Sequence, residues 1–284
     1  MACDEHRSMT NRLVLALLIA ALFCAGASAA TAPAIHDPVE AKAYLAALRI
    51  QAPVARAVAL EAFAAKYPKS VARIAALDEA MSDYQDAGQE GNMGRIAALI
   101  LDADPTNLSA LVTATYLTRT AAADGDPAKV AALDAYAVRG LAALDGWQKS
   151  AGMSAADFAK LRAQTTAVFY GAHAFAALER KDFAHAREAY LMAFAAAPNA
   201  VDVYQLGTTD LQMSPIDASG FWYVARAVAL LQAQGAAGGA AQVAEFGRTY
   251  YAKYHGSDDG WDAIVAAAAT QVAIPPDFGV TRHG

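Results

Sequence analysis

Apolar residues recur along this chain at intervals of three and four positions, which is the spacing of one face of an α-helix. Between positions 71 and 89, for example, the recurring residues are Ile74, Leu77, Met81 and Tyr84. No segment alternates apolar and polar residues with a period of two, so the pattern predicts no β-strand. Alanine, the best helix former, is by far the most frequent residue. The chain is therefore predicted to be all-α.

Start and stop signals divide this pattern into helices. Asp37 precedes Pro38, Asp126 precedes Pro127, and both pairs place a capping acid before a proline at the first helical position. Ser154 begins a sequence that resembles a capping box at the start of a long helix. We expect a break at Gly91-Asn92. The other expected helices cover residues 41–50, 53–67, 71–89, 93–103, 108–119, 128–144, 242–255 and 261–272.

The stretch 170–198 contains two apolar helical faces separated by Lys181-Asp182. Its aromatic, small and closing positions are Tyr170, Ala174, Ala186, Tyr190 and Pro198. This arrangement resembles a tetratricopeptide repeat, in which alanines let two antiparallel helices approach and aromatic residues fill the space beside them. His173 and Ala177 depart from the usual Leu and Tyr of that repeat.

Other parts of the chain resemble the same family less closely. Tyr67-Pro68 and Asp104-Pro105 end helical pairs in a similar way. The segments GFWYVARAVALL and YYAKYHGSDDGWD resemble the ending of uncharacterised exported bacterial tetratricopeptide-like proteins. The resemblance implies an irregular helical-hairpin array, or α-solenoid, over residues 37–273, followed by a flexible tail at 274–284.

In this family the first helix of each hairpin lines a concave binding surface. Carried onto this sequence, the resemblance implies a partner-binding face made of Val168, Phe175, Leu178, Tyr204, Thr208 and Leu211. These residues are apolar or neutral, so an extended or helical apolar peptide is the expected partner.

The first residues read as an export signal. Arg12 precedes the apolar run Leu13–Phe23, and Ala27-Ser28-Ala29 has the form of a cleavage site. We expect a signal peptide at 1–29, a flexible lead at 30–36 and a periplasmic or secreted protein without a stable membrane span. Asp4 and Glu5 are unusual before such a run, so we expect Met9 to be the true start. An uncleaved inner-membrane anchor at 13–30 is the alternative.

The amino-acid composition excludes several kinds of chemical site and of binding partner. Both cysteines, Cys3 and Cys24, lie in the expected signal peptide, so the mature chain would contain no disulfide and no thiolate metal site. The net charge is −6, and no basic stripe with interleaved aromatic residues is present, so nucleic acid is not an expected partner.

No catalytic or cofactor motif is found. His173 and His185 lie on opposite helices of the central hairpin without a zinc-binding pattern, and a packing or surface role is expected for both. Asp258, Asp259 and Asp262 lack the spacing of a calcium loop and are interpreted as acids at a helix N-terminus. We therefore expect no catalytic residue, no metal and no cofactor.

Two functional hypotheses remain. The first is a non-enzymatic scaffold of the cell envelope that binds a peptide or protein in a concave helical groove. The alternative is an envelope enzyme for cell-wall polymers, or its accessory subunit, with a carboxylate pair in the groove. Convergence of two carboxylates in the structure is the feature that would favour the second.

Overall fold

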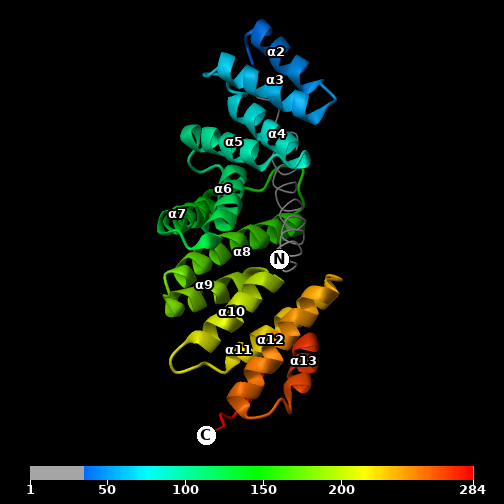
Figure 1. Ribbon diagram of the computed structural model, residues 1–284. Helices are drawn as coiled ribbons and strands as arrows, with labels where there is room; N and C mark the ends of the chain where they lie inside the picture. Colours follow the sequence, from blue (N-terminus) through cyan, green and yellow to red (C-terminus); the bar gives the residue numbers. More distant parts are fainter. Residues whose placement is uncertain (1–34, 284) are drawn as a thin grey trace. The chain divides into compact units, whose positions relative to one another are not determined.

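The computed structural model describes residues 35–283, and every regular element in that range is helical (Figure 1). The α-helices are α2 (Pro38–Leu48), α3 (Pro53–Lys66), α4 (Arg73–Asp86), α5 (Glu90–Ala103), α6 (Leu108–Ala121), α7 (Pro127–Ala143), α8 (Ala155–Glu179), α9 (Phe183–Ala196), α10 (Ala200–Gln212), α11 (Ser219–Ala233), α12 (Ala237–His255) and α13 (Trp261–Thr270). The predicted all-α class is confirmed. The expected signal peptide at 1–29 lies outside the described residues. Within 35–283, no helix is both long enough and apolar enough to cross a membrane.

Three predicted helix starts are confirmed by their capping bonds. The carboxylate of Asp37 accepts a hydrogen bond from the Val39 amide at 2.7 Å, and Asp126 accepts one from Ala128 at 2.8 Å. The hydroxyl of Ser154 accepts one from the Asp157 amide at 3.0 Å. These acceptors satisfy amides that have no partner inside a first helical turn.

The predicted break at Gly91-Asn92 is wrong. Both residues lie inside α5, and the chain turns earlier, at Gly88, whose φ is 68°. Glycine reaches this left-handed conformation without a side-chain clash. The amide of Gln89 then bonds to the carbonyl of Tyr84 at 2.8 Å, which ends α4 in a Schellman turn.

The same turn recurs at two later helix ends. Lys181 and Gly235 also have positive φ, and the residues after them bond back to Ala177 and Leu231 at 3.0 and 2.9 Å. The turns at Gly88 and Lys181 are followed by helices of 14 residues each, α5 and α9. After each of these helices an asparagine, Asn107 or Asn199, caps the next one. The chain thus repeats one hairpin pattern, α4–α5–α6 and α8–α9–α10.

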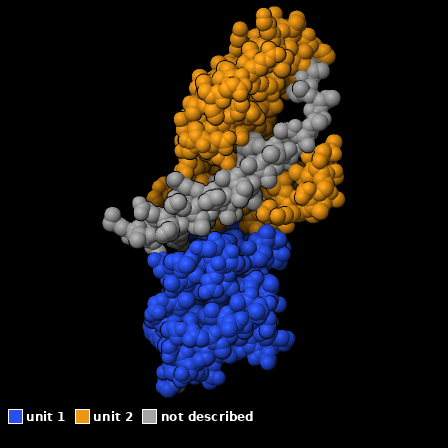
Figure 2. All heavy atoms as spheres, turned by 90° about the vertical axis from the view of Figure 1, so that its right-hand side faces the viewer, with its two compact units in different colours: residues 1–8, 170–284 blue, residues 9–169 orange. Residues whose placement is uncertain are grey.

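The described chain forms two compact units, and the boundary between them falls within α8 (Figure 2). In the N-terminal unit, residues 35–169, each helix from α2 to α7 packs against the next one along the chain. Leu60, Leu77, Ile96 and Leu111 are fully buried there. The core is built from apolar faces of the helices, as the sequence pattern predicts.

The C-terminal unit, residues 170–283, is organised around α11, against which α10, α12 and α13 all pack. Its largest buried side chains are Trp222, Trp261, Tyr190 and Phe221. The backbones of α10 and α11 meet at Gly207 and Gly220: a Cβ on Gly220 would lie 2.5 Å from the Gly207 carbonyl oxygen. Only glycine permits this approach.

Residues 274–283, expected to be a flexible tail, have defined contacts in the structure. Ile274, Phe278 and Val280 are partly buried against the aromatic core of the C-terminal unit. The segment has no regular secondary structure, as expected, but burial of these apolar side chains fixes its course.

Candidate functional site

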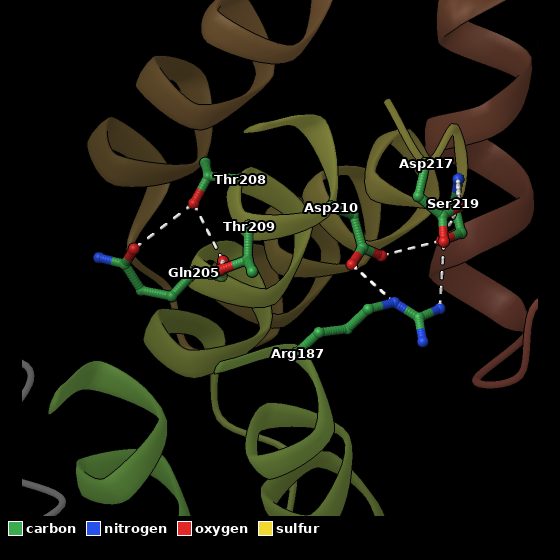
Figure 3. A network of polar contacts seen from close by, with 7 residues as sticks. All are labelled: Arg187, Gln205, Thr208, Thr209, Asp210, Asp217 and Ser219. Atoms are coloured by element: carbon green, nitrogen blue, oxygen red, sulfur yellow. Dashed lines mark hydrogen bonds and ion pairs between the residues drawn. The ribbon is translucent and has the colours of Figure 1, made fainter. Parts of the chain in front are cut away.

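A polar cluster in the C-terminal unit joins α9, α10 and the start of α11 (Figure 3). Arg187 donates from Nε to Asp210 Oδ1 at 2.9 Å and lies with Nη2 3.2 Å from Asp217 Oδ2. The Ser219 hydroxyl lies 2.8 Å from Asp210 Oδ2 and 2.7 Å from Asp217 Oδ1. Two carboxylates therefore converge on one guanidinium and one hydroxyl.

The sequence positions these groups through the end of α10. Asp210 lies on the face of α10 that also carries the buried Leu206, so its carboxylate points into the unit and is fully buried. Asp217 lies in the loop before α11 and accepts a hydrogen bond from the amide of Ser219, the first residue of that helix, at 3.0 Å. Nearby hydroxyls bond within their own helix: Thr208 and Thr209 both donate to the Gln205 carbonyl (Figure 3).

The two carboxylates differ in their acidity. Burial raises the pKa of Asp210 to about 6, although the Ser219 hydrogen bond and the charge of Arg187 oppose the rise. Burial acts in the same direction on Asp217, but hydrogen bonds from Ser219 and the charge of Arg187 lower the pKa of that group below its ordinary value. Separated acidities of this kind also occur in acid–base pairs of enzymes.

The geometry leaves this pair little capacity for catalysis. Each oxygen of Asp210 and Asp217 already has a donor, either on Arg187 or on Ser219. The side chain of Asp210 has 0% exposure, so a substrate oxygen has no access to it. A general acid or base needs hydrogen-bond reach to its substrate. The cluster instead ties three helical segments together.

A second carboxylate, that of the partly buried Asp78, joins two helices of the N-terminal unit. Asp78 on α4 accepts hydrogen bonds from the Ser109 hydroxyl at 2.7 Å and from the Asn107 side chain at 3.4 Å, at the start of α6. Burial raises the pKa of Asp78 to about 6, although these two bonds oppose the rise. The carboxylate fixes the first turn of α6 against α4.

The C-terminal unit has a similar junction between helices, but there the carboxylate comes from the other helix. Gly171 on α8 and Asp78 on α4 are at equivalent positions: each lies the same number of residues before a turn, at Lys181 and at Gly88 respectively. The carboxylate at this junction comes from α10 instead: Asp202 Oδ2 accepts from the Asn199 side chain at 2.6 Å. A Cβ on Gly171 would lie 2.3 Å from that same oxygen. One carboxylate thus fills each junction: Asp78 comes from the first helix of the pattern, α4, and Asp202 comes from the third, α10.

The six residues expected on a partner-binding face fall into two groups in the structure. Val168 packs against the core of the N-terminal unit, and Leu211, at 2% exposure, is part of the core of the other unit. The expectation for Leu211 is therefore corrected: its side chain contacts the α10–α11 junction, near the position of Gly220, and is not open to a partner.

The remaining four residues belong to the C-terminal unit and are partly exposed. Phe175 and Leu178 lie on α8, and Tyr204 and Thr208 lie on α10. The Tyr204 ring packs edge-on against Phe246 of α12, with 5.6 Å between the ring centroids. This contact joins α10 to α12 through two partly exposed aromatic rings.

The histidines and the C-terminal acids form no metal site among the described residues, where no group of three or more potential ligands is close enough to hold an ion. His185 bonds to its own cap residue, Asp182, at 2.6 Å. Asp258 and Asp262 instead share one cation, Arg248, at 2.9 and 2.5 Å. The two Arg248 contacts connect α12 to the loop before α13 and to the first turn of α13.

The Arg187 cluster was not predicted from the sequence. Asp210 lies near the end of α10, Asp217 lies in the loop before α11, and Arg187 lies on α9, so no local pattern relates the three. A signal was nonetheless present, because Asp210 falls on the same helical face as apolar residues of α10, where an acid requires a partner.

Comparison with known proteins identifies no family: no family model matches the chain, and no curated protein and no solved structure is significantly similar to it.

Proposed function

We propose that this protein is a non-enzymatic interaction protein of the cell envelope, built from tetratricopeptide-like hairpins, that binds an extended or helical apolar segment of another protein. The observation that carries the proposal is the repeated hairpin, in which the Schellman turns at Gly88 and Lys181 precede second helices of equal length and an asparagine cap. Repeated helical hairpins of this kind typically serve as extended binding surfaces.

The polar groups support a binding role over a catalytic one. The carboxylates of Asp78 and Asp210 bond to residues at the start of another helix, α6 and α11 respectively. Asp202 bonds to the cap of its own helix and fills the space beside Gly171 on α8. Their geometry is used to hold one helix against another. This leaves the partly exposed apolar and aromatic side chains as the groups available to a ligand, and aromatic residues commonly dominate such contacts.

The proposed binding face lies in the C-terminal unit and consists of Phe175, Leu178, Tyr204 and Thr208, with Phe246 beside Tyr204. The face is neutral, so we expect an apolar segment to bind there and a charged chain terminus to bind weakly. Tyr204 is the centre of the proposal because its ring is shared between α10 and α12.

Site-specific photocrosslinking tests the proposal. A photoreactive phenylalanine analogue is placed at position 204, and in a control at position 192, where Met192 is 50% exposed on α9. We expect the first variant to crosslink one defined envelope protein and the control not to do so. The Tyr204→Ala variant should lose recovery of that protein while it keeps the wild-type helical spectrum.

Equal crosslinking at both positions, or none at 204, would contradict the proposed face. The enzymatic alternative has its own test: hydrolysis of a cell-wall polymer by the purified protein, abolished in Asp217→Asn, would replace the binding role with a catalytic one.

A further inference from the structure

The last described residues of the chain cross the C-terminal unit without a helix or strand, and they contain a turn in which the Phe278 amide donates to the Pro275 carbonyl at 3.0 Å. Phe278 is the anchor of this segment, because its ring packs edge-on against Trp222 with 5.4 Å between the ring centroids. Ile274 and Val280, on either side of it, are also partly buried against the same core. The segment therefore presents an aromatic residue flanked by aliphatic ones, as many bound peptides do.

The far end of the segment is bound through its backbone at the end of α12. The His283 amide donates to the Tyr254 carbonyl at 2.9 Å. The ring Nδ1 of His255 lies 2.9 Å from the Thr281 carbonyl oxygen, which it reaches as a donor. A Cβ on Gly256 would lie 2.7 Å from the His283 ring, so a glycine leaves the space that the tail occupies.

These contacts hold the segment by few interactions. Pro276, Asp277, Gly279 and Arg282 are exposed, and the three apolar side chains are only partly buried. The Trp222 indole nitrogen is buried without a hydrogen-bond acceptor among the described residues. An unpaired buried donor is costly, and the tail supplies no acceptor for this one.

We propose that the surface formed by Trp222, Tyr254 and His255 is a peptide-binding site that the chain's own residues 274–283 occupy as a displaceable strap. The ligand it fits is a segment of another protein with an aromatic residue between two aliphatic ones and, as in the tail, a turn just before the aromatic residue. The tail competes as a tethered ligand, at the high effective concentration that tethering gives. This surface is distinct from the face around Tyr204, and its test does not depend on that face.

A synthetic peptide with the sequence of residues 274–284 and a fluorescent label is the probe. Its binding to the full chain is measured by anisotropy for the wild type, for Phe278→Ala and for Asp277→Ala, which changes an exposed residue of the same segment. We expect at least tenfold tighter binding to Phe278→Ala, because loss of the anchor vacates the surface. The wild type and Asp277→Ala should bind equally weakly. A peptide with Ala in place of its Phe should not bind.

Equal affinity for all three proteins, or no binding to a folded Phe278→Ala variant, would overturn the proposal. If circular dichroism shows that Phe278→Ala is unfolded, Val280→Ser takes its place, because that side chain is smaller and only partly buried. At least threefold tighter peptide binding to Val280→Ser than to the wild type supports the strap, and unchanged binding rejects it.

Discussion

The carboxylate of Asp202 occupies the space in which a side chain would begin on Gly171, since its Oδ2 oxygen lies 2.3 Å from the position of a Cβ there. Asp202 is 4% exposed and is bonded to Asn199. It therefore has little freedom to retreat from a larger neighbour, and the glycine on α8 is required by the acid on α10.

Gly171→Ala should destabilise the protein by about 1–3 kcal/mol, because the added methyl overpacks this junction. The free energy of unfolding in urea measures the change. Gly91→Ala is the matched control, since nothing lies within 4 Å of a Cβ there and the residue is helical. That control should gain about 0.5–1 kcal/mol, as alanine does over glycine in a helix. The idea is wrong if the two variants shift in the same direction.

The turn at Lys181 offers a test of backbone strain. Its φ of 60° is costly for any residue with a Cβ, whereas the equivalent turns carry Gly88 and Gly235. Lys181→Gly should therefore stabilise the protein by about 1 kcal/mol, and Gly88→Ala should destabilise it by a similar amount. A Cβ at position 88 meets no atom within 4 Å, so the second change isolates the backbone effect. Thermal melting of both variants would contradict the interpretation if Lys181→Gly melts earlier than the wild type.

Asp78 makes stability depend on pH. Burial raises its pKa from 3.8 to about 6 in the folded chain, so the folded state holds the proton more tightly than the unfolded state. The stabilisation from this proton is complete when the pH is below the pKa of Asp78 in the unfolded chain. It is lost as the pH rises through the pKa of Asp78 in the folded chain. Between pH 4 and pH 7 the contribution of this group should fall by about 1–3 kcal/mol.

Asp78→Asn is the variant that tests this dependence, because the amide keeps the shape of the side chain but does not ionise. We expect the stability difference between pH 4 and pH 7 to shift by that amount in favour of pH 7, relative to the wild type. Exposed Asp102→Asn serves as the control. Identical pH profiles for Asp78→Asn and the wild type would rule out Asp78 as the source.

Ala186 tests the packing of the central hairpin. It is fully buried in the core of the C-terminal unit, whereas Ala184, on the same helix, is exposed. Ala186→Leu should cost about 1–3 kcal/mol through overpacking, and Ala184→Leu should be close to neutral. Chemical denaturation of both proteins provides the comparison. If Ala186→Leu is as stable as Ala184→Leu, the two helices do not approach as closely as described.

The sequence predicted helices better than it predicted the turns between them. Asp37, Asp126 and Ser154 were identified correctly as caps because a capping side chain acts on amides only two or three residues away. Gly91 was mistaken for a break, because two glycines lie close together and only the backbone conformation distinguishes them. At Lys181 no glycine was present to mark the left-handed residue at all.

Contacts between distant residues were beyond what local patterns reveal. Asp210 on α10 bonds to Arg187 on α9, and Phe278 in the tail packs against Trp222 on α11. The residues of each pair lie on different segments, so no helical periodicity relates them. The tail was expected to be a flexible segment. Burial of its apolar side chains, which composition alone does not register, determines its position.

Neighbour-to-neighbour packing of the helices sets how this chain can fold. From α2 to α7, each helix packs against the one that follows it, and α9, α10, α11 and α12 do the same. Such contacts close only short loops, which cost little chain entropy and allow rapid folding. Each hairpin can consequently form as soon as its own residues are available, without waiting for the opposite end of the chain.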